Sequence, residues 1–367
     1  MSGAVLLEEI LRAAVTRGGS DIHLKVPAPP ALRIDGRLER LDEFAGVKPG
    51  VAESVLAVML ASLPHSSKQN EFERTGDVDF AYAHPGLGRF RVNAFRQRGS
   101  VSMVIRVVPF GVPHADELGI SASVLSLLEH QDGLIIVTGA PGSGVTTTLA
   151  ALVDHLNGTV VRNVLTFEDP IEVLHADRQC AVSQREIGLD TPSFAQGLDR
   201  ALRHDSDVIA VSALPDLASV EAALALAQTG VLVLVAVRSP DVAGAIRRLT
   251  GLYPDDRQRQ ARAELARTLR GVVVQRLLPR ADGAGRCLAS EVLPGTTKVR
   301  QAIEDGAPAS EIAAHIDSQA NVGGVSLNES LAELVVRGTA TLESALGAAR
   351  DAAGLERLVA ARMTLGE

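Results

Sequence analysis

After residue 133, short and strongly apolar runs alternate with longer segments whose apolar residues recur at helical spacing. The apolar runs are 134–138, 160–167, 207–212 and 231–237, and the helical segments between them are 146–156, 193–203 and 217–229. Continuous apolar runs are typical of buried strands, and their alternation with helices is typical of a parallel sheet. The pattern therefore predicts an α/β domain that is built on a parallel sheet.

The first 110 residues follow a different pattern. Residues 4–17 have apolar residues at helical spacing and end at Gly18-Gly19, which predicts a helix. Mostly alternating stretches follow and predict strands at 20–25, 31–36, 77–83, 89–95 and 101–108. We therefore expect a small α+β domain over 1–110, a linker over 111–117, the sheet domain over 118–295 and a helical region over 296–367. Within these last two parts, the segments 257–279 and 326–349 are predicted to be helices.

Composition excludes several classes of protein. A net charge of −8 argues against a nucleic-acid partner, which a basic face would serve. With only Cys180 and Cys287, the chain has neither a tetracysteine zinc module nor a disulfide scaffold, and both thiols are interpreted as inert. This cysteine usage fits a reducing cytosol.

The first 18 residues do not have the pattern of a signal peptide, and the most apolar run, 230–237, is far shorter than the ~18 residues that span a bilayer. We therefore expect no direct membrane insertion.

A glycine-rich loop follows the apolar run 134–138. It reads Gly139-Ala-Pro-Gly142-Ser143-Gly144-Val145-Thr146-Thr147 and leads into a predicted helix, which is the context of a phosphate-binding loop of the form G-x-x-x-x-G-K-[ST]. The backbone N–H groups at Gly142, Ser143 and Gly144 would face a phosphate, and the Thr146 hydroxyl stands where Mg²⁺ is ligated. The alternative is an ordinary glycine-rich turn without a ligand.

One residue of this loop departs from the motif. Val145 stands at the position of the lysine, which in such loops reaches the β- and γ-phosphates and neutralises their charge. Valine has neither a donor nor a charge. The loop therefore predicts weak phosphate binding with a sharp loss of transition-state stabilisation.

Several longer motifs resemble one family over almost the whole chain. They are 19–24 (GSDIHL), 32–36 (LRIDG), 88–95 (GRFRVNAF), 166–172 (TFEDPIE), 183–188 (SQREIG), 201–207 (ALRHDSD), 275–279 (QRLLP) and 326–331 (SLNESL). In this order and spacing they resemble the retraction-motor (PilT-like) ATPases of type IV pili. Pilus-assembly and secretion relatives usually carry a tetracysteine insertion, which this chain lacks, so the retraction branch fits better.

The resemblance implies a PAS-like N-terminal domain followed by a RecA-like P-loop domain, assembled as a hexameric ring. It also implies ATP and Mg²⁺ as cofactors. The implied partners are further copies of the chain or a competent paralogue in the ring, and the inner-membrane platform protein of the pilus. The implied location is cytoplasmic, peripheral to the inner membrane through those partners.

The departures from the family pattern gather in the motifs of the nucleotide site. Ala213 stands where the family has the Walker B glutamate that orients the attacking water, and Pro215 replaces an arginine before the retained Asp216. In the segment that the family calls the His box, Val231 and Arg238 replace two histidines. We therefore expect four replaced positions in one site, namely Val145, Ala213, Val231 and Arg238.

Other residues of the family pattern persist. Glu168 and Asp169 stand in the acidic motif near Mg²⁺ and water, although an exposed acidic turn is an alternative interpretation. Arg91 and Arg106 lie on predicted strands where family members present arginines to the γ-phosphate, and a solvated strand face is equally compatible with them. His23 is interpreted as a structural hydrogen-bonding residue rather than a catalytic one.

Two hypotheses follow. The first is a pseudo-ATPase with impaired ATP binding that acts as an accessory or regulatory ring subunit in pilus retraction and twitching motility. The second is an active hexameric motor with a non-standard site, in which Glu168 or Arg238 takes over a lost role. A third possibility, a non-functional relic, stays open.

Overall fold

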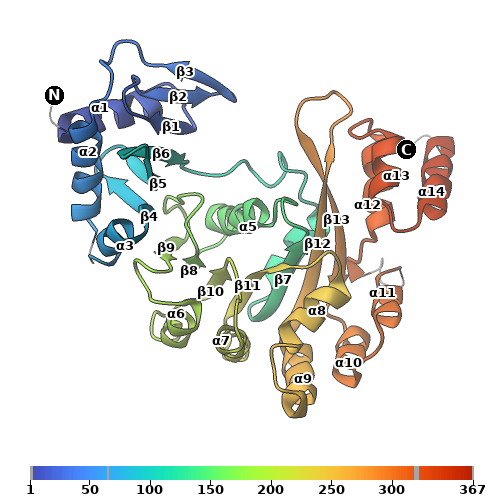
Figure 1. The fold of residues 1–367 in the computed structure, drawn as a ribbon. Helices are drawn as coiled ribbons and strands as arrows, with labels where there is room; N and C mark the ends of the chain where they lie inside the picture. The colour runs from blue at the N-terminus through green and yellow to red at the C-terminus, as the bar shows by residue number, and fades with distance from the viewer. Residues whose placement is uncertain (1–2, 64–65, 318–321, 366–367) are drawn as a thin grey trace. The chain divides into compact units, whose positions relative to one another are not determined.

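The computed structural model describes residues 3–63, 66–317 and 322–365, which divide into two compact units, Met1–Phe110 and Gly111–Glu367 (Figure 1). None of the described helices combines the length and apolar character that a membrane-spanning helix needs.

The first unit is one antiparallel sheet with three helices. In spatial order the strands are β3 (Arg37–Arg40), β2 (Ala31–Ile34), β1 (Asp21–Leu24), β6 (Ser100–Val108), β5 (Gly88–Gln97) and β4 (Asp77–His84). The helices are α1 (Gly3–Thr16), α2 (Pro49–Ala61) and α3 (Ser67–Thr75). Alternate strand residues, such as Ile22, Val92 and Ile105, pack with α1 and α2 in one apolar core. The mixed α+β character is as predicted, and the PAS-like assignment stays a prediction.

The second unit is built on a seven-stranded sheet. In spatial order the strands are β13 (Arg286–Pro294), β12 (Leu269–Pro279), β7 (Gly133–Gly139), β11 (Leu232–Arg238), β10 (Val208–Val211), β8 (Asn163–Glu168) and β9 (Ala181–Glu186). All neighbouring pairs are parallel except β12 with β13, which form an antiparallel hairpin. The mixed α/β fold with a parallel sheet is confirmed.

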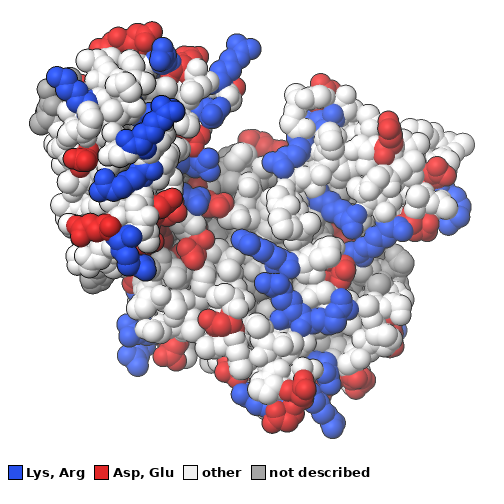
Figure 2. All heavy atoms as spheres, in the orientation of Figure 1, with Lys and Arg blue, Asp and Glu red and all other residues white. Residues whose placement is uncertain are grey.

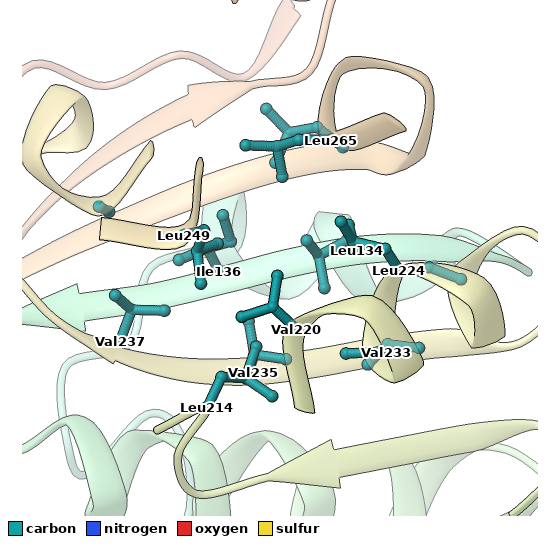
Figure 3. Packing of buried hydrophobic residues seen from close by; sticks show 14 of the residues in the cluster. Leu134, Ile136, Leu214, Val220, Leu224, Val233, Val235, Val237, Leu249 and Leu265 are labelled. Carbon is teal, nitrogen blue, oxygen red and sulfur yellow. The ribbon is translucent and has the colours of Figure 1, made fainter. Parts of the chain in front are cut away.

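Helices cover both faces of this sheet. The longer elements are α5 (Val145–Thr159), α6 (Phe194–Ala201), α7 (Leu217–Ala227), α8 (Val242–Thr250), α9 (Gln258–Thr268), α10 (Thr297–Asp305), α11 (Ala309–Asp317), α12 (Leu327–Val336), α13 (Leu342–Ala348) and α14 (Ala352–Leu365), with short turns at α4 (Ala122–Ser126), η1 (Leu127–Glu129) and η2 (Asp255–Arg257). Ile135 and Val137 of β7 pack with α5 on one face, whereas Leu134 and Ile136 pack on the other. On that second face Val233 and Val235 of β11 point toward Val220 and Leu224 of α7 (Figure 3).

The expected helix over 257–279 is wrong in its second half. α9 ends at Thr268, and β12 begins at Leu269. The run Val272-Val273-Val274 is β-branched and buried on both faces, which suits a central strand between β7 and β13 better than an amphipathic helix. The expected helix over 326–349 is also divided, because Gly338 adopts a left-handed φ of 67° between α12 and α13.

The C-terminal helices have a small apolar core of their own against the β12–β13 hairpin. An ion pair also ties them to the sheet, because Arg350 Nη1 donates to both carboxylate oxygens of Glu291 at 3.0 and 2.9 Å. The Glu291 side chain is only 4% exposed. Burial raises the pKa of Glu291, and the charge of Arg350 acts against that rise.

Removing Arg350 should therefore destabilise the fold, because it leaves a buried carboxylate without its countercharge. We expect Arg350→Met to lower the free energy of unfolding by about 3 kcal/mol at neutral pH in urea titration. Arg357→Met is the matched control, since Arg357 is 77% exposed and its nearest carboxylate is 4.0 Å away. Equal stability of the two variants would show that the Glu291–Arg350 pair does not hold the C-terminal region.

Candidate functional site

The glycine-rich loop joins β7 to α5 in a conformation that depends on its glycines. Gly142 and Gly144 have left-handed φ angles of 79° and 86°. A side chain at Gly139 would lie 2.2 Å from the Ser143 hydroxyl and 2.8 Å from the carbonyl oxygen of Gln275. The loop is therefore a close-packed turn at the N-terminus of a 15-residue helix, which is the arrangement that binds phosphate.

A buried side chain of β12, the strand next to β7, is hydrogen-bonded to the loop. Gln275 of β12 is paired with Gly139 in the sheet and is 1% exposed. Its Nε2 donates to the Ser143 carbonyl oxygen at 2.8 Å. The Ser143 N–H in turn donates to the Ala140 carbonyl at 3.0 Å, so the turn is closed by its own backbone. These hydrogen bonds, from β12 and within the loop, thus set the loop conformation.

Val145 is the first residue of α5, and its side chain is used for packing. It is half-buried and lies against the apolar cluster between α5 and the sheet, together with Leu277. A valine in this cluster contributes apolar contact and offers no charge to a ligand. The next residue, Thr146, is half-buried and lines a pocket, and Thr147 lines the same pocket from a more exposed position.

This pocket has a volume of about 230 Å³ and lies between α5 and the carboxyl ends of β8 and β10. Its lining residues are Thr146, Thr147, Leu149, Ala150, Val153, Thr166, Glu168, Glu172, Val173, His175, Ala210 and Ser212. The structure therefore brings Thr146 of the loop and Glu168 of the acidic motif to one cavity. Among the described residues, no three His, Cys, Asp or Glu side chains form a metal-binding group. A Mg²⁺ ion here would depend on the Thr146 hydroxyl and on the phosphates of a ligand.

Glu168 is held by three donors. Thr166 Oγ1 and Gln184 Nε2 donate to its Oε1 at 2.6 and 2.9 Å, and the Glu172 N–H donates to the same carboxylate. Burial raises the pKa of Glu168, and these hydrogen bonds act against the rise without cancelling it. Gln184 also fixes the wall of the pocket, because its amide bonds to the Val173 carbonyl and to the His175 N–H, both at 2.9 Å.

Asp169 lies outside the pocket. Its side chain is exposed, and its N–H donates to the Ser212 hydroxyl at 3.1 Å. The two carboxylates of the acidic motif are therefore separated, with Glu168 toward the pocket and Asp169 toward solvent. His175 was not singled out from the sequence, because a single histidine after this motif has no spacing that marks it. Its Nδ1 is buried without a partner among the described residues, and burial lowers its pKa.

Ala213 follows β10 at the same edge of the sheet. It is half-buried against the apolar cluster on the α7 face and has no polar side-chain atom. The retained Asp216 is occupied as the N-cap of α7, where its Oδ1 accepts the Ser219 N–H at 2.8 Å. Neither residue therefore replaces the missing glutamate.

The expectation that Val231 belongs to the same site as Val145, Ala213 and Arg238 is wrong, because in this chain Val231 lies at the other edge of the sheet. Val231 precedes β11, and its carbonyl accepts the N–H of Gly133 at 3.1 Å, so it lies where β7 begins. Arg238 is paired with Gly139, where β7 ends. β11 is seven residues long and rises ~3.3 Å per residue, so Val231 before its start and Arg238 at its end lie far apart. Sequence motifs placed both replacements in one segment, but a strand carries its two ends to opposite edges of the sheet.

Arg91 and Arg106 are direct neighbours on β5 and β6 of the first unit. Arg106 Nε donates to Asp21 Oδ1 at 2.8 Å, although its side chain is 61% exposed. Burial opposes the ionisation of Asp21, but hydrogen bonds from Arg106 and Ser20 outweigh it and hold the pKa below its usual value. Arg106 is thus engaged within its own unit, and its role toward a phosphate stays a prediction.

Three further interpretations concern single side chains. The Nε2 of His23 is buried without a partner among residues that the structure describes, and burial lowers the pKa of this imidazole. Burial thus favours the neutral imidazole, and its Nε2 makes none of the structural hydrogen bonds that we expected. Both cysteines are buried, and burial raises the pKa of each thiol, which leaves both unreactive.

Comparisons with known proteins agree on one family. A model of the family described as type II/IV secretion system protein matches residues 4–315. The type IV pilus retraction ATPase PilT of Pseudomonas aeruginosa is 34% identical over 339 residues, which cover 92% of this chain and 96% of that protein. The type IV pilus ATPase PilU of the same organism is 32% identical over 352 residues, 96% of this chain and 91% of that protein. A solved structure of the pilus retraction motor PilT with bound ADP is similar with a TM-score of 0.82 at 39% identity, covering 95% of this chain and 98% of that one.

The raised pKa of Glu168 gives a stability prediction. A carboxyl whose pKa is higher in the folded state costs stability as pH rises from the unfolded value through the folded one, and costs nothing below both. Glu168→Gln removes that cost and keeps an oxygen for Thr166 and Gln184. We expect it to raise the free energy of unfolding by about 1 kcal/mol at pH 8 and by almost nothing at pH 4.

Glu117→Gln is the control for this experiment, because Glu117 is exposed and lies outside the pocket. Denaturant unfolding at both pH values measures the difference. A Glu168→Gln variant that is less stable than the parent at pH 8 would show that Glu168 is held as a stabilised carboxylate instead.

Proposed function

This chain belongs to the family of type II/IV secretion system proteins, among its PilT- and PilU-like type IV pilus ATPases, and within that family we propose that it is a pseudo-ATPase. It binds nucleotide weakly through the loop 139–146, does not turn ATP over, and acts as an accessory or regulatory subunit in pilus retraction. The observation that carries this proposal is the loop itself. Gly142 and Gly144 keep left-handed φ angles at the N-terminus of α5, while Val145 packs into the apolar layer under α5.

The charge at the γ-phosphate supports the same conclusion. Stabilising the transition state of phosphoryl transfer requires positive charge that moves with the transferred group, and the lysine of the loop normally supplies it. Val145 cannot. Losing one charge-assisted contact costs roughly 1.5–3 kcal/mol, which is about one to two orders of magnitude in affinity.

The carboxylates at the site support it as well. Ala213 cannot accept a proton or hold a water, and Asp216 is used as a helix cap. Glu168 already accepts hydrogen bonds from Thr166, Gln184 and the Glu172 backbone, so water must compete with three fixed donors for its oxygens.

A second candidate function is an active motor that uses Glu168 as its base. One observation favours it, because Glu168 shares a pocket with Thr146 and has a raised pKa, which makes a carboxylate a better proton acceptor. The candidate still lacks a group that neutralises the γ-phosphate from within the loop.

For either function we propose the assembly and location that serve pilus retraction. The chain joins a hexameric ring with further copies of itself or with a competent paralogue, and the ring contacts the inner-membrane platform protein from the cytoplasm. In a mixed ring, a subunit that binds nucleotide without hydrolysis would hold its neighbours in one nucleotide state. Arg91 and Arg106 are the residues that we propose to sense phosphate.

We expect the rate of phosphate release at saturating Mg-ATP to equal that of a Gly144→Asp variant. This blank works because any side chain at Gly144 is strained at its left-handed φ and adds, as aspartate, negative charge to the phosphate site. A clear excess over the blank that Glu168→Ala abolishes would favour the active motor and end the pseudo-ATPase proposal.

Repair of the site should need more than one residue, because groups that act together in phosphoryl transfer are not additive. Val145→Lys should tighten ATP binding about tenfold or more with turnover still at background. Val145→Lys combined with Ala213→Glu and Arg238→His should give measurable turnover. Val231→His is left out, since Val231 is buried in the core at the other edge of the sheet.

The control for this repair is Val145→Lys with Arg238→His and Ala218→Glu, which makes the same charge changes but places the carboxylate on an exposed residue of α7. Full activity from Val145→Lys alone would show that the arguments from Ala213 and Arg238 are wrong. A folded triple variant without turnover would show that the scaffold has also drifted.

A further inference from the structure

Two arginines that belong to no motif of the phosphate loop lie beside it. Arg286 is the first residue of β13, and its Nη1 donates to the carbonyl oxygen of Gly142 at 3.3 Å. Arg238 is the last residue of β11 and is paired with Gly139, where the loop begins. In the sheet order β13-β12-β7-β11, these two positions stand on opposite sides of β7.

Both arginines lie on the face of the sheet that α5 covers. Leu288 and Val292, which alternate with Arg286 along β13, pack in the same cluster as α5 residues, and so do Leu232 and Leu234, which alternate with Arg238 along β11. The register of the two strands therefore directs both side chains to the side on which the helix and the loop stand.

Among the residues that the structure describes, neither arginine has a countercharge. The Arg286 side chain bonds there only to the Gly142 carbonyl, and the Arg238 side chain has no polar partner. Arg280 on the same hairpin differs, because its Nε contacts Asp282 at 3.2 Å. Lys and Arg side chains also gather over α8, which follows Arg238 in the chain and carries the exposed Arg247 and Arg248 (Figure 2).

We propose that Arg286, with Arg238 on the other side, supplies from outside the loop the positive charge that Val145 does not supply, and that the site thereby binds the diphosphate group of a nucleotide. The positive charges around the loop support this proposal. The backbone N–H groups of the loop and the N-terminus of α5 attract an anion, and two arginines without countercharges raise the local potential further. The proposal deepens the proposed function, on which it rests, by naming the cations of its weak nucleotide site.

The position of Arg286 also separates binding from hydrolysis. The guanidinium comes from β13, the second strand from β7, and is bonded to a loop carbonyl, so its charge lies beside the loop backbone. Charge that contributes equally to the bound nucleotide and to the transition state increases affinity without increasing turnover. A site with this arrangement would hold nucleotide and not process it.

The experiment compares Arg286→Gln, Arg286→Lys and the control Arg280→Gln in calorimetric titrations with ADP, inorganic pyrophosphate and adenosine. Arg286→Gln should weaken ADP and pyrophosphate about tenfold and leave adenosine unchanged. Arg286→Lys should stay within about threefold of the parent, since the charge is kept. Arg280→Gln should bind like the parent. Added salt should weaken the parent more than it weakens Arg286→Gln.

Several outcomes overturn the proposal. Parental ADP affinity in Arg286→Gln, or no binding of ADP and pyrophosphate by the parent chain, would show that Arg286 does not serve the site. If Arg286→Gln and Arg286→Lys lose the same ADP and pyrophosphate affinity and the salt dependence is unchanged, Arg286 only stabilises the loop through the Gly142 carbonyl. Weaker adenosine binding in Arg286→Gln would assign it to the base. ATP turnover by the parent would refute the proposed function and leave these binding results intact.

Discussion

The phosphate loop takes its shape from one buried side chain, Gln275. Gln275 lies on the strand next to β7, and its buried Nε2 donates to the Ser143 carbonyl, whereas its Oε1 has no partner among the described residues. Because the backbone of Gln275 is paired with Gly139, its side-chain amide holds the loop at a fixed distance from the sheet. The turn, the start of α5 and the pocket beside Thr146 all follow from that distance, so the loop can keep its conformation whether or not Val145 is a lysine.

Binding and chemistry are thereby separated in this site. Phosphate binding by a glycine-rich loop depends on backbone N–H groups, which no side-chain replacement removes. Phosphoryl transfer depends on side chains at defined positions, and these are the positions that have changed. The same fold can therefore lose the side chains of turnover while it keeps the backbone of the loop.

The sequence predicted the parallel strands and the glycine-rich turn between β7 and α5, because buried strands, glycines and a following helix are local signals. That this loop binds phosphate stays a prediction. It failed where the deciding contact is distant. The strand Leu269–Pro279 was taken as helix, since its central position between β7 and β13 is invisible in a single segment. Val231 and Arg238 were assigned to one site, because a motif does not say that a strand separates its ends. Arg286 was missed, since it follows Gly142 by 144 positions in the chain.

The replacements are also part of the packing, which bears on whether they are isolated losses. Val145 packs in the cluster under α5, and Ala213 packs against the cluster on the α7 face. A lysine at 145 would have to extend its charged end past that apolar layer into the loop, and a glutamate at 213 would have to leave a half-buried position for the edge of the sheet. The lysine and the glutamate would therefore each lose apolar contact and place a charge in solvent or on a ligand. Apolar packing therefore favours the residues that are present, whereas turnover would require charged side chains at these positions.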